Sequence, residues 1–548
     1  MTPERELSPS PAEASLENLY RIFTVPEASD SRLARIDHEI TENLGGFLRD
    51  RIVAVEKGLE EIEADFASPV IPEQPCYVSD YTDYLMEKLV AHSVHTAAPG
   101  FIGHMATPLP YFMLPLARIM TALNQNLVKI ETSKAFTPLE RQVLAMLHQL
   151  VFGRDEAFYA TWMHEAGSAL GAFCSGGTIA NITALWAARN RFLGPRPGFP
   201  GLSAAGLVAA MGASGYEGLA VLVSRRGHYS LGKAVDLLGI GRDNLIAIDT
   251  DADSRVDTRT LRERCASLEA ARIKVLAVVG IAGTTETGSV DPLEELADIA
   301  AQYRAHFHVD AAWGGPTLFS SRYRPLLAGI ERADSVTIDA HKQLYVPIGA
   351  GMVLFRDPAA LSAIEHHAEY VLRRGSKDLG ARTLEGSRPG MAMLVHAGLH
   401  IIGRRGYELL VEQNIERAQA LARLIMASTD FELVTAPTLN ILSYRYVPAP
   451  VQRQLRDAPR SLRQRINAVL DEVTQTIQKI QRAAGDSFVS RTRIPAASHD
   501  GDTVTVFRVV LANPMTSIEV LEKVLREQAS IAASAELAPL WSRIGELH

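Results

Sequence analysis

The 548-residue sequence contains few cysteines and no long apolar run. Cys76, Cys174 and Cys265 lie far apart, so they provide neither a disulfide framework nor the spacing of a zinc site. No uninterrupted apolar stretch approaches the roughly 20 residues of a membrane-spanning helix. Residues 1–14 are polar and lack the apolar core of a secretory signal. We therefore expect a cytoplasmic protein with reduced thiols, no metal site and no membrane segment.

An excess of positive charge is also missing. The formal net charge is −8, which disfavours nucleic acid or an anionic membrane as the main partner. Hydrophobic residues make up 47% of the chain and charged residues 22%, as in ordinary globular proteins. The length exceeds what one core supports. We expect a helical arm that packs on a second subunit at 1–110, a large domain at 111–392 and a small domain at 393–548.

Short apolar runs alternate with helical patterns through the middle of the chain, which favours an α/β fold with a largely parallel sheet. The predicted strands of this region are 219–224, 245–249, 274–280, 307–309, 335–338 and 351–355.

Two of these strands end in charged residues that could act together. Asp310 follows the strand 307–309, and Lys342 lies just beyond the strand 335–338. The carboxyl ends of parallel strands are where α/β proteins bind ligands. A partly desolvated lysine there can form a Schiff base with an aldehyde, and a carboxylate can keep a pyridine nitrogen protonated. The pair is what pyridoxal phosphate requires.

A glycine pair opens a helix in the segment Phe173–Asn181. Glycines at such a position let backbone N–H groups approach an anion, and the helix dipole favours phosphate there. This helix start is therefore a candidate site for a phosphate group.

The motifs Asp339-Ala340-His341-Lys342 and His308-Val309-Asp310-Ala311-Ala312 resemble those of the pyridoxal-phosphate-dependent group II amino acid decarboxylases. The resemblance runs from about Phe101 to the C-terminus. It implies the aspartate-aminotransferase-like fold, fold type I of the pyridoxal-phosphate enzymes, and a homodimer whose second subunit completes the active site. Within the family the chain is most similar to bacterial enzymes that act on aspartate, with glutamate decarboxylases next.

The resemblance also implies roles for single residues. Lys342 would carry the cofactor, Asp310 would face its ring nitrogen, and His228 would stack on its ring. Tyr370 would donate a proton to the substrate carbon. Further contacts with the cofactor or substrate are implied for Gly177, Thr178, Thr285, Ala312, His341, His104, Thr107 and Arg388.

Three questions stay open at this stage. Asp310 and Lys342 would serve an aminotransferase or another carbon–carbon lyase equally well, although the Tyr370 segment favours decarboxylation. A non-catalytic relative that only dimerises is a further alternative. Nothing in the residues separates aspartate from glutamate or cysteine sulfinate, and Arg388 could hold either substrate carboxylate. The resemblance implies aspartate, with β-alanine for pantothenate synthesis as the product.

Overall fold

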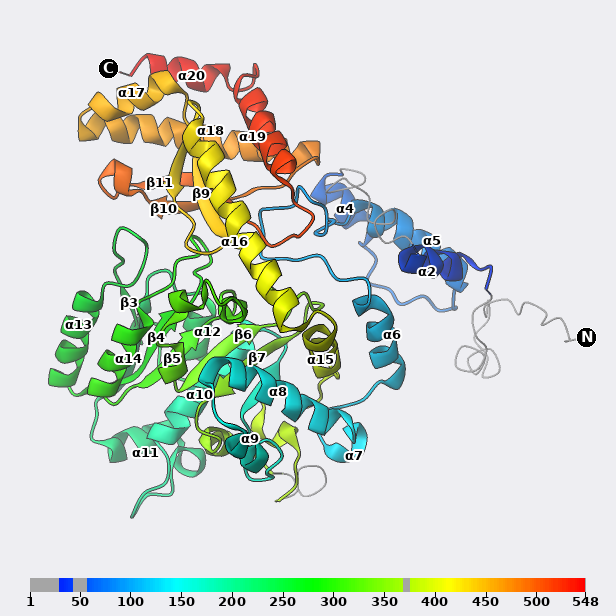
Figure 1. Ribbon diagram of the computed structural model, residues 1–548, viewed down its shortest axis with the longest axis vertical. Helices are drawn as coiled ribbons and strands as arrows, with labels where there is room; N and C mark the ends of the chain where they lie inside the picture. The colour runs from blue at the N-terminus through cyan, green and yellow to red at the C-terminus, as the bar shows by residue number, and fades with distance from the viewer. Residues whose placement is uncertain (1–28, 43–56, 368–374, 548) are drawn as a thin grey trace, which may run out of the picture.

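The structure is a computed structural model that describes residues 29–42, 57–367 and 375–547. It contains a large sheet domain, a smaller domain above it in the view of Figure 1, and an N-terminal arm that extends to one side. No helix in these ranges is long and apolar enough to cross a membrane.

The large sheet has seven strands in the order β1-β7-β6-β5-β4-β2-β3. All neighbouring pairs are parallel except those of β7, which runs antiparallel to both β6 and β1. The largely parallel α/β sheet expected from the sequence is thus confirmed. The strands are β1 (Gly171–Cys174), β2 (Gly218–Ser224), β3 (Leu245–Ile248), β4 (Ile273–Ile281), β5 (His306–Asp310), β6 (Ser335–Asp339) and β7 (Gly351–Phe355).

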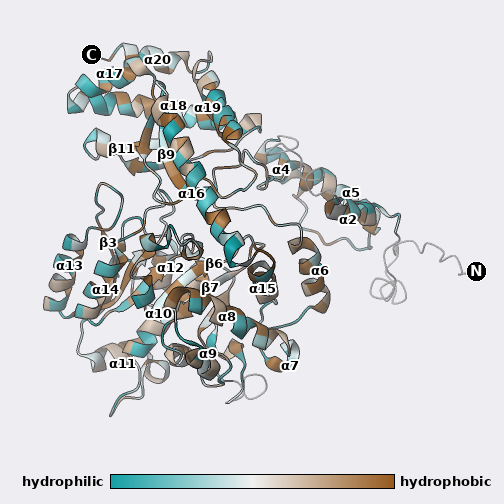
Figure 2. Ribbon diagram, viewed as in Figure 1, coloured by the Kyte–Doolittle hydropathy of each residue, from teal (hydrophilic) through white to brown (hydrophobic). Residues whose placement is uncertain are grey.

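Helices cover both faces of this sheet (Figure 1). The central strands are buried on both faces, and Figure 2 shows them predominantly brown, as expected for near-continuous apolar strands. The helices of this part are α8 (Phe136–Phe152), α9 (Glu156–Trp162), α10 (Gly177–Phe192), α11 (Leu202–Ser214), α12 (Ser230–Leu237), α13 (Thr258–Ala270), α14 (Leu293–Gln302) and α15 (Ala392–Ile401).

The small domain is built on an antiparallel sheet in the order β10-β11-β9-β8. Its longest helices are α16 and α18, and α16 runs from the large domain up to the small one (Figure 1). The elements are α16 (Gly403–Ala427), β8 (Phe431–Thr435), β9 (Ile441–Tyr446), α17 (Ala449–Asp457), α18 (Arg460–Ala484), β10 (Ser490–Pro495), β11 (Thr503–Val510), α19 (Ile518–Ala532) and α20 (Ala538–Gly545). The predicted domain boundary at 392/393 falls just inside α15.

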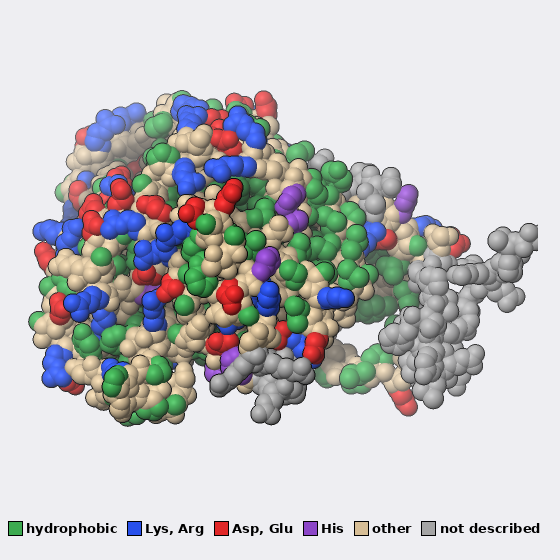
Figure 3. All heavy atoms as spheres, turned by 60° about the horizontal axis from the view of Figure 1, so that its bottom comes forward, with side chains coloured by type: hydrophobic (Ala, Val, Ile, Leu, Met, Phe, Trp, Pro, Cys, Tyr) green, Lys and Arg blue, Asp and Glu red, His purple; other side chains and the backbone are tan. Residues whose placement is uncertain are grey.

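The arm and the residues that follow it expose many large apolar side chains. Figure 3 shows hydrophobic side chains gathered between the arm and the body of the molecule. The sequence predicts helix over 16–66, and the described residues of that range form α2 and α4. The α-helices in the described part before α8 are short: α2 (Arg32–Glu42), α4 (Leu59–Asp65), α5 (Val78–Lys88), α6 (Met113–Leu123) and α7 (Ile130–Ser133). The exposed apolar side chains there are Leu33, Leu59, Phe66, Val70, Ile71, Tyr81, Leu89, Val94, Tyr111, Ile119 and Leu123.

Candidate active site

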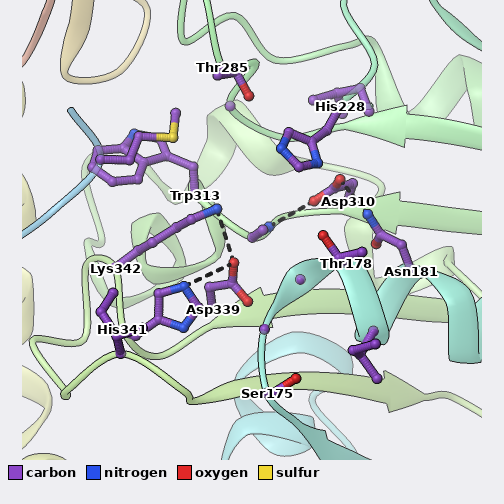
Figure 4. Close-up of a pocket in the computed structure, with 18 of the residues that line it drawn as sticks. Ser175, Thr178, Asn181, His228, Thr285, Asp310, Trp313, Asp339, His341 and Lys342 are labelled. Carbon is purple, nitrogen blue, oxygen red and sulfur yellow. Dashed lines mark hydrogen bonds and ion pairs between the residues drawn. The ribbon is translucent and has the colours of Figure 1, made fainter. Parts of the chain in front are cut away.

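A cavity of about 340 Å³ opens at the carboxyl edge of the large sheet. The ends of β2, β4, β5 and β6 meet there with the N-terminus of α10 (Figure 4). Its lining includes most of the residues singled out from the sequence, namely Gly177, Thr178, His228, Thr285, Asp310, Ala312, His341 and Lys342.

Lys342 reaches into this cavity from the turn after β6, where its Nζ lies 3.0 Å from Oδ2 of the buried Asp339. The backbone of the lysine is also held, because the Thr107 hydroxyl donates to the Lys342 carbonyl at 2.9 Å. The neighbouring His341 donates from Nδ1 to the Ala350 carbonyl at 2.9 Å. The amine is thus presented from a fixed backbone beside a carboxylate.

Asp310 ends β5, the strand that pairs directly with β6. The expected placement of Asp310 and Lys342 at the ends of neighbouring strands is therefore what the sheet has. The Asp310 Oδ1 accepts from the Ala312 N–H at 3.1 Å, and Oδ2 accepts from the Asn181 side-chain amide at 2.8 Å. Two donors thus orient a carboxylate that is 6% exposed.

His228 lies across the cavity from the lysine turn, in the loop between β2 and α12. Its Nδ1 lies 2.9 Å from the Ser230 hydroxyl and 3.3 Å from the Ser230 backbone N–H. A backbone N–H can only donate, so Nδ1 is an acceptor and the ring proton is on Nε2. Burial lowers the pKa of His228, which favours this neutral form.

A backbone amide just before α10 contacts a carboxylate, because the Ser175 N–H donates to Glu385 at 3.0 Å. The contact of Gly177 and Thr178 with a phosphate stays a prediction. A Cβ on Gly177 would lie 2.9 Å from the Asp339 Oδ2, so a larger residue would have to displace this carboxylate. Together with the amine of Lys342 and the carboxylate of Asp310, this donor set fits a phosphorylated pyridine aldehyde.

Arg388 does not line the cavity. Its guanidinium makes a bidentate contact with Glu140, at 2.9 Å from Nη2 to Oε1 and 3.2 Å from Nη1 to Oε2. Both side chains are buried. The charge of this arginine is therefore already balanced, and its predicted contact with substrate stays a prediction.

Two other arginines near the cavity differ from Arg388 in having no carboxylate within hydrogen-bonding distance among the described residues. Arg226 lines the cavity, and its buried Nε has no hydrogen-bond partner among the described residues. Arg508 on β11 donates to the carbonyls of Thr285 and Gly103, while its Nη2 is likewise unpartnered there. Burial lowers the pKa of Arg508 to about 10, so it stays charged at neutral pH.

The remaining predicted residues lie apart from the cavity lining. His104 borders a separate hollow between the arm and the small domain. Its pKa is lowered by burial and then by the charges of Arg508 and Lys342. Tyr370 lies outside the described residues, so its predicted role as proton donor stays a prediction.

Sequence reasoning missed several lining residues, chiefly Asn181, Arg226, Trp313 and Asp339. A signal existed for two of them. Asp339 stands three residues before Lys342 in the same motif. Asn181 follows Gly177 by four residues, and this spacing places Gly177 and Asn181 on the same face of α10.

Comparisons with known proteins agree with this geometry. The sequence profile of the pyridoxal-dependent decarboxylase conserved domain matches residues 65–447. Aspartate 1-decarboxylase from Aliivibrio fischeri is 59% identical over 534 residues, covering 97% of this chain and 98% of that protein. L-2,4-diaminobutyrate decarboxylase from Rhizobium meliloti is 30% identical over 439 residues, covering 79% and 78%. The crystal structure of mouse CSAD in apo form superimposes with a TM-score of 0.78 at 25% identity, covering 91% of this chain and 98% of that one.

Proposed function

The chain belongs to the pyridoxal-dependent decarboxylases, and on that premise we propose that it converts L-aspartate into β-alanine and carbon dioxide. The observation that carries the substrate assignment is the 59% identity to an aspartate 1-decarboxylase over nearly the whole of both chains. Glutamate and cysteine sulfinate are the alternative substrates, because they too combine an α-amino acid with an acidic side chain.

The cofactor site follows from the donor set of the cavity. When bound, pyridoxal phosphate supplies an aldehyde that joins the substrate amine and a ring that accepts the electrons released with carbon dioxide. In our proposal Lys342 holds the aldehyde, and the N-terminus of α10 at Gly177 and Thr178 holds the phosphate. Asp310 keeps the ring nitrogen protonated, and the neutral His228 covers one face of the ring.

Further contacts complete this proposal. Thr285, Ala312 and His341 line the same cavity and limit the space around the ring. Thr107 acts on Lys342 through its backbone carbonyl. Tyr370 remains our proposed proton donor to the substrate carbon, a role that would require the segment around it to approach the cavity.

An acidic substrate also needs a cation for its carboxylates. Arg508 suits this role because it bonds backbone carbonyls rather than a carboxylate and its buried Nη2 has no partner among the described residues. Arg388 also has an unpartnered Nε, but its charge is paired with Glu140. Arg226 is a second candidate, with Glu286 at 3.9 Å, and the charge of Glu286 also acts on Arg508. We therefore propose Arg508 first, with His104 beside it as an additional polar contact.

We further propose that the protein acts as a homodimer in the cytoplasm and that the second subunit completes the active site. Exposed apolar side chains on the arm and α6 support a subunit interface, because grouped exposed apolar side chains mark protein–protein contact sites.

The function is tested by incubating the purified protein with pyridoxal phosphate and separate acidic amino acids, and by measuring carbon dioxide and amine product together. We expect β-alanine from aspartate in equal amount to carbon dioxide, at a higher kcat/KM than for glutamate or cysteine sulfinate. The Lys342→Ala variant should be inactive, and borohydride should attach the cofactor to Lys342 in the wild type. Faster turnover of glutamate would reject the proposed substrate, and a reduced adduct on another lysine would reject the proposed site.

A further inference from the structure

A row of buried, hydrogen-bonded side chains runs beneath the cavity and centres on Asn181 of α10, which is 1% exposed. Its amide Nδ2 donates to the Asp310 Oδ2 at 2.8 Å and to the Ser230 hydroxyl at 3.0 Å. Its Oδ1 accepts from the Thr337 hydroxyl at 2.8 Å and from the His308 Nε2 at 3.0 Å. All four bonding positions of this one amide are therefore used.

The orientation of the amide follows from its partners. An ionised carboxylate can only accept hydrogen bonds, so Asn181 must turn its NH₂ group towards Asp310. Its carbonyl then faces Thr337 and His308, and the His308 Nε2 must carry a proton to donate.

The same logic continues along the row. The neutral His308 ring accepts at Nδ1 from the Ser335 hydroxyl at 2.8 Å, and that hydroxyl accepts from the His306 Nε2 at 2.7 Å. Burial lowers the pKa of His308 to about 4, so the ring is neutral near pH 7 as this arrangement requires.

The Asn181 amide is also connected to His228 on the other side of the cavity, through Ser230. Ser230 accepts from Asn181, and its own hydroxyl proton is free to go to the His228 Nδ1, which lies 2.9 Å away. One side chain thus connects the carboxylate at the end of β5 with the imidazole before α12.

We propose that Asn181 is a positioning residue that holds Asp310 and His228 in register for the cofactor, and that Thr337 and His308 set its orientation. The inference rests on the proposed function only through the cofactor and not through the identity of the substrate. Its test therefore measures cofactor binding, so a wrong substrate assignment would leave the outcome unaffected.

The Asn181→Asp variant is the sharpest test, because the new side chain has nearly the same shape. As a carboxylate it repels Asp310, whereas in its protonated form it can donate to Asp310 and still accept from Thr337 and His308. Adjacent carboxylates share a proton more readily as the pH falls. The titratable groups around this position are His228, His308, Asp310, Asp339 and Lys342.

The measurement is the dissociation constant of pyridoxal phosphate from the reconstituted apoprotein, relative to the wild type, at about pH 8.5 and about pH 6.5. We expect the variant to bind at least about tenfold more weakly at the higher pH, since a hydrogen bond to a charged group is lost, and to recover at the lower pH. The Asn181→Leu variant cannot form these hydrogen bonds at any pH, so it should bind pyridoxal phosphate weakly at both pH values.

The matched control is Asn190→Asp, the same change in a buried residue of the same helix, about 14 Å further along its axis. For Asn190→Asp, the dissociation constant of pyridoxal phosphate relative to that of the wild type should be the same at both pH values. If Asn181→Asp binds like the wild type at both pH values, or equally weakly at both, the proposal is overturned.

A second variant, Thr337→Val, tests the proposal independently if Asn181→Asp does not fold. Thr337→Val removes one donor to the Asn181 carbonyl and keeps the side-chain shape. We expect cofactor binding to weaken about threefold or more, with the absorbance of the bound cofactor shifted in its pH dependence. Unchanged affinity and unchanged absorbance in this variant would also overturn the proposal.

Discussion

At the scale of single residues, Asp339 has an unusual position. One carboxylate oxygen pairs with the Lys342 amine, and the buried Oδ1 has no hydrogen-bond partner among the described residues. A buried acceptor without a donor is costly, and such atoms are commonly completed by a ligand or an ordered water. Asp339 therefore belongs with the cofactor site, although the sequence motif drew attention to Lys342.

Replacement by glutamine should affect stability at Arg388 and substrate binding at Arg508. Arg388→Gln leaves Glu140 buried without its partner, which should lower the free energy of unfolding by about 3–5 kcal/mol, with little change in KM of the folded enzyme. Arg508→Gln should instead raise KM for aspartate by about tenfold or more, because a charge-assisted contact is lost. Urea denaturation and steady-state kinetics on both variants measure this. A raised KM in Arg388→Gln alone would return the substrate role to Arg388.

At the scale of elements, the start of α10 and the end of β6 approach so closely that a side chain at position 177 would displace the Asp339 carboxylate. In Gly177→Ala the added Cβ would lie 2.9 Å from the Asp339 Oδ2 and displace the partner of Lys342. Overpacking of this kind costs about 1–3 kcal/mol, so the cofactor dissociation constant should rise about tenfold.

Gly232 in α12 is the matched control, since a Cβ there meets nothing within 4 Å. Gly232→Ala should bind cofactor normally and gain up to about 1 kcal/mol of stability. Equal cofactor affinity in the two variants, measured by fluorescence titration, would contradict the role of the α10 terminus.

Helix α8 carries a buried histidine whose charge state links stability to pH. His148 bonds the Tyr159 hydroxyl and the Phe355 carbonyl, and burial lowers its pKa to about 4. Between the ordinary value of 6.5 and about 4, the unfolded chain binds the proton and the folded one does not. Stability therefore falls as the pH drops through this range, by up to about 1.4 kcal/mol per pH unit for this group.

The His148→Gln variant should reduce that slope, because its amide can donate to Phe355 and accept from Tyr159 without titrating. Unfolding midpoints of both proteins between about pH 7 and pH 5 measure the difference. Identical pH dependence in the two proteins would exclude His148 as a contributor.

At the scale of the whole molecule, the arm stands away from the body and exposes its apolar residues (Figures 1 and 3). Val70 and Ile71 are 73% and 88% exposed. A helical arm of this kind cannot bury its apolar side chains within its own chain, which is why a second copy is the partner that we propose.

The double variant Val70→Asp, Ile71→Asp should weaken this dimer. Burial of each side chain is worth about 1.5–3 kcal/mol, so the dimer dissociation constant should rise by at least about tenfold, as measured by analytical ultracentrifugation. Val208→Asp on α11 is the control, because Val208 is 90% exposed and lies outside the arm. A dimer of unchanged strength in the arm variant, or a monomeric wild type, would reject the proposed interface.

The sequence alone determined six of the seven strands of the large sheet and the pairing of its two reactive strand ends. Alternating strand and helix patterns are local, and a parallel crossover brings the end of β5 beside the end of β6, so Asp310 and Lys342 could be placed together. Strand β1, with the sequence Gly-Ala-Phe-Cys, escaped prediction because it has none of the β-branched residues that mark the other strands of this sheet.

Only the tertiary structure decided which buried polar groups are partners. Glu140 and Arg388 are 248 positions apart in the chain, and Asn181 and Asp310 are 129 apart. Its charge and the family resemblance made Arg388 a candidate for substrate, whereas Asn181 went unnoticed. A buried charge or amide is stable only when packing supplies its complement, and that complement is set by which helix crosses which strand, which no local pattern encodes.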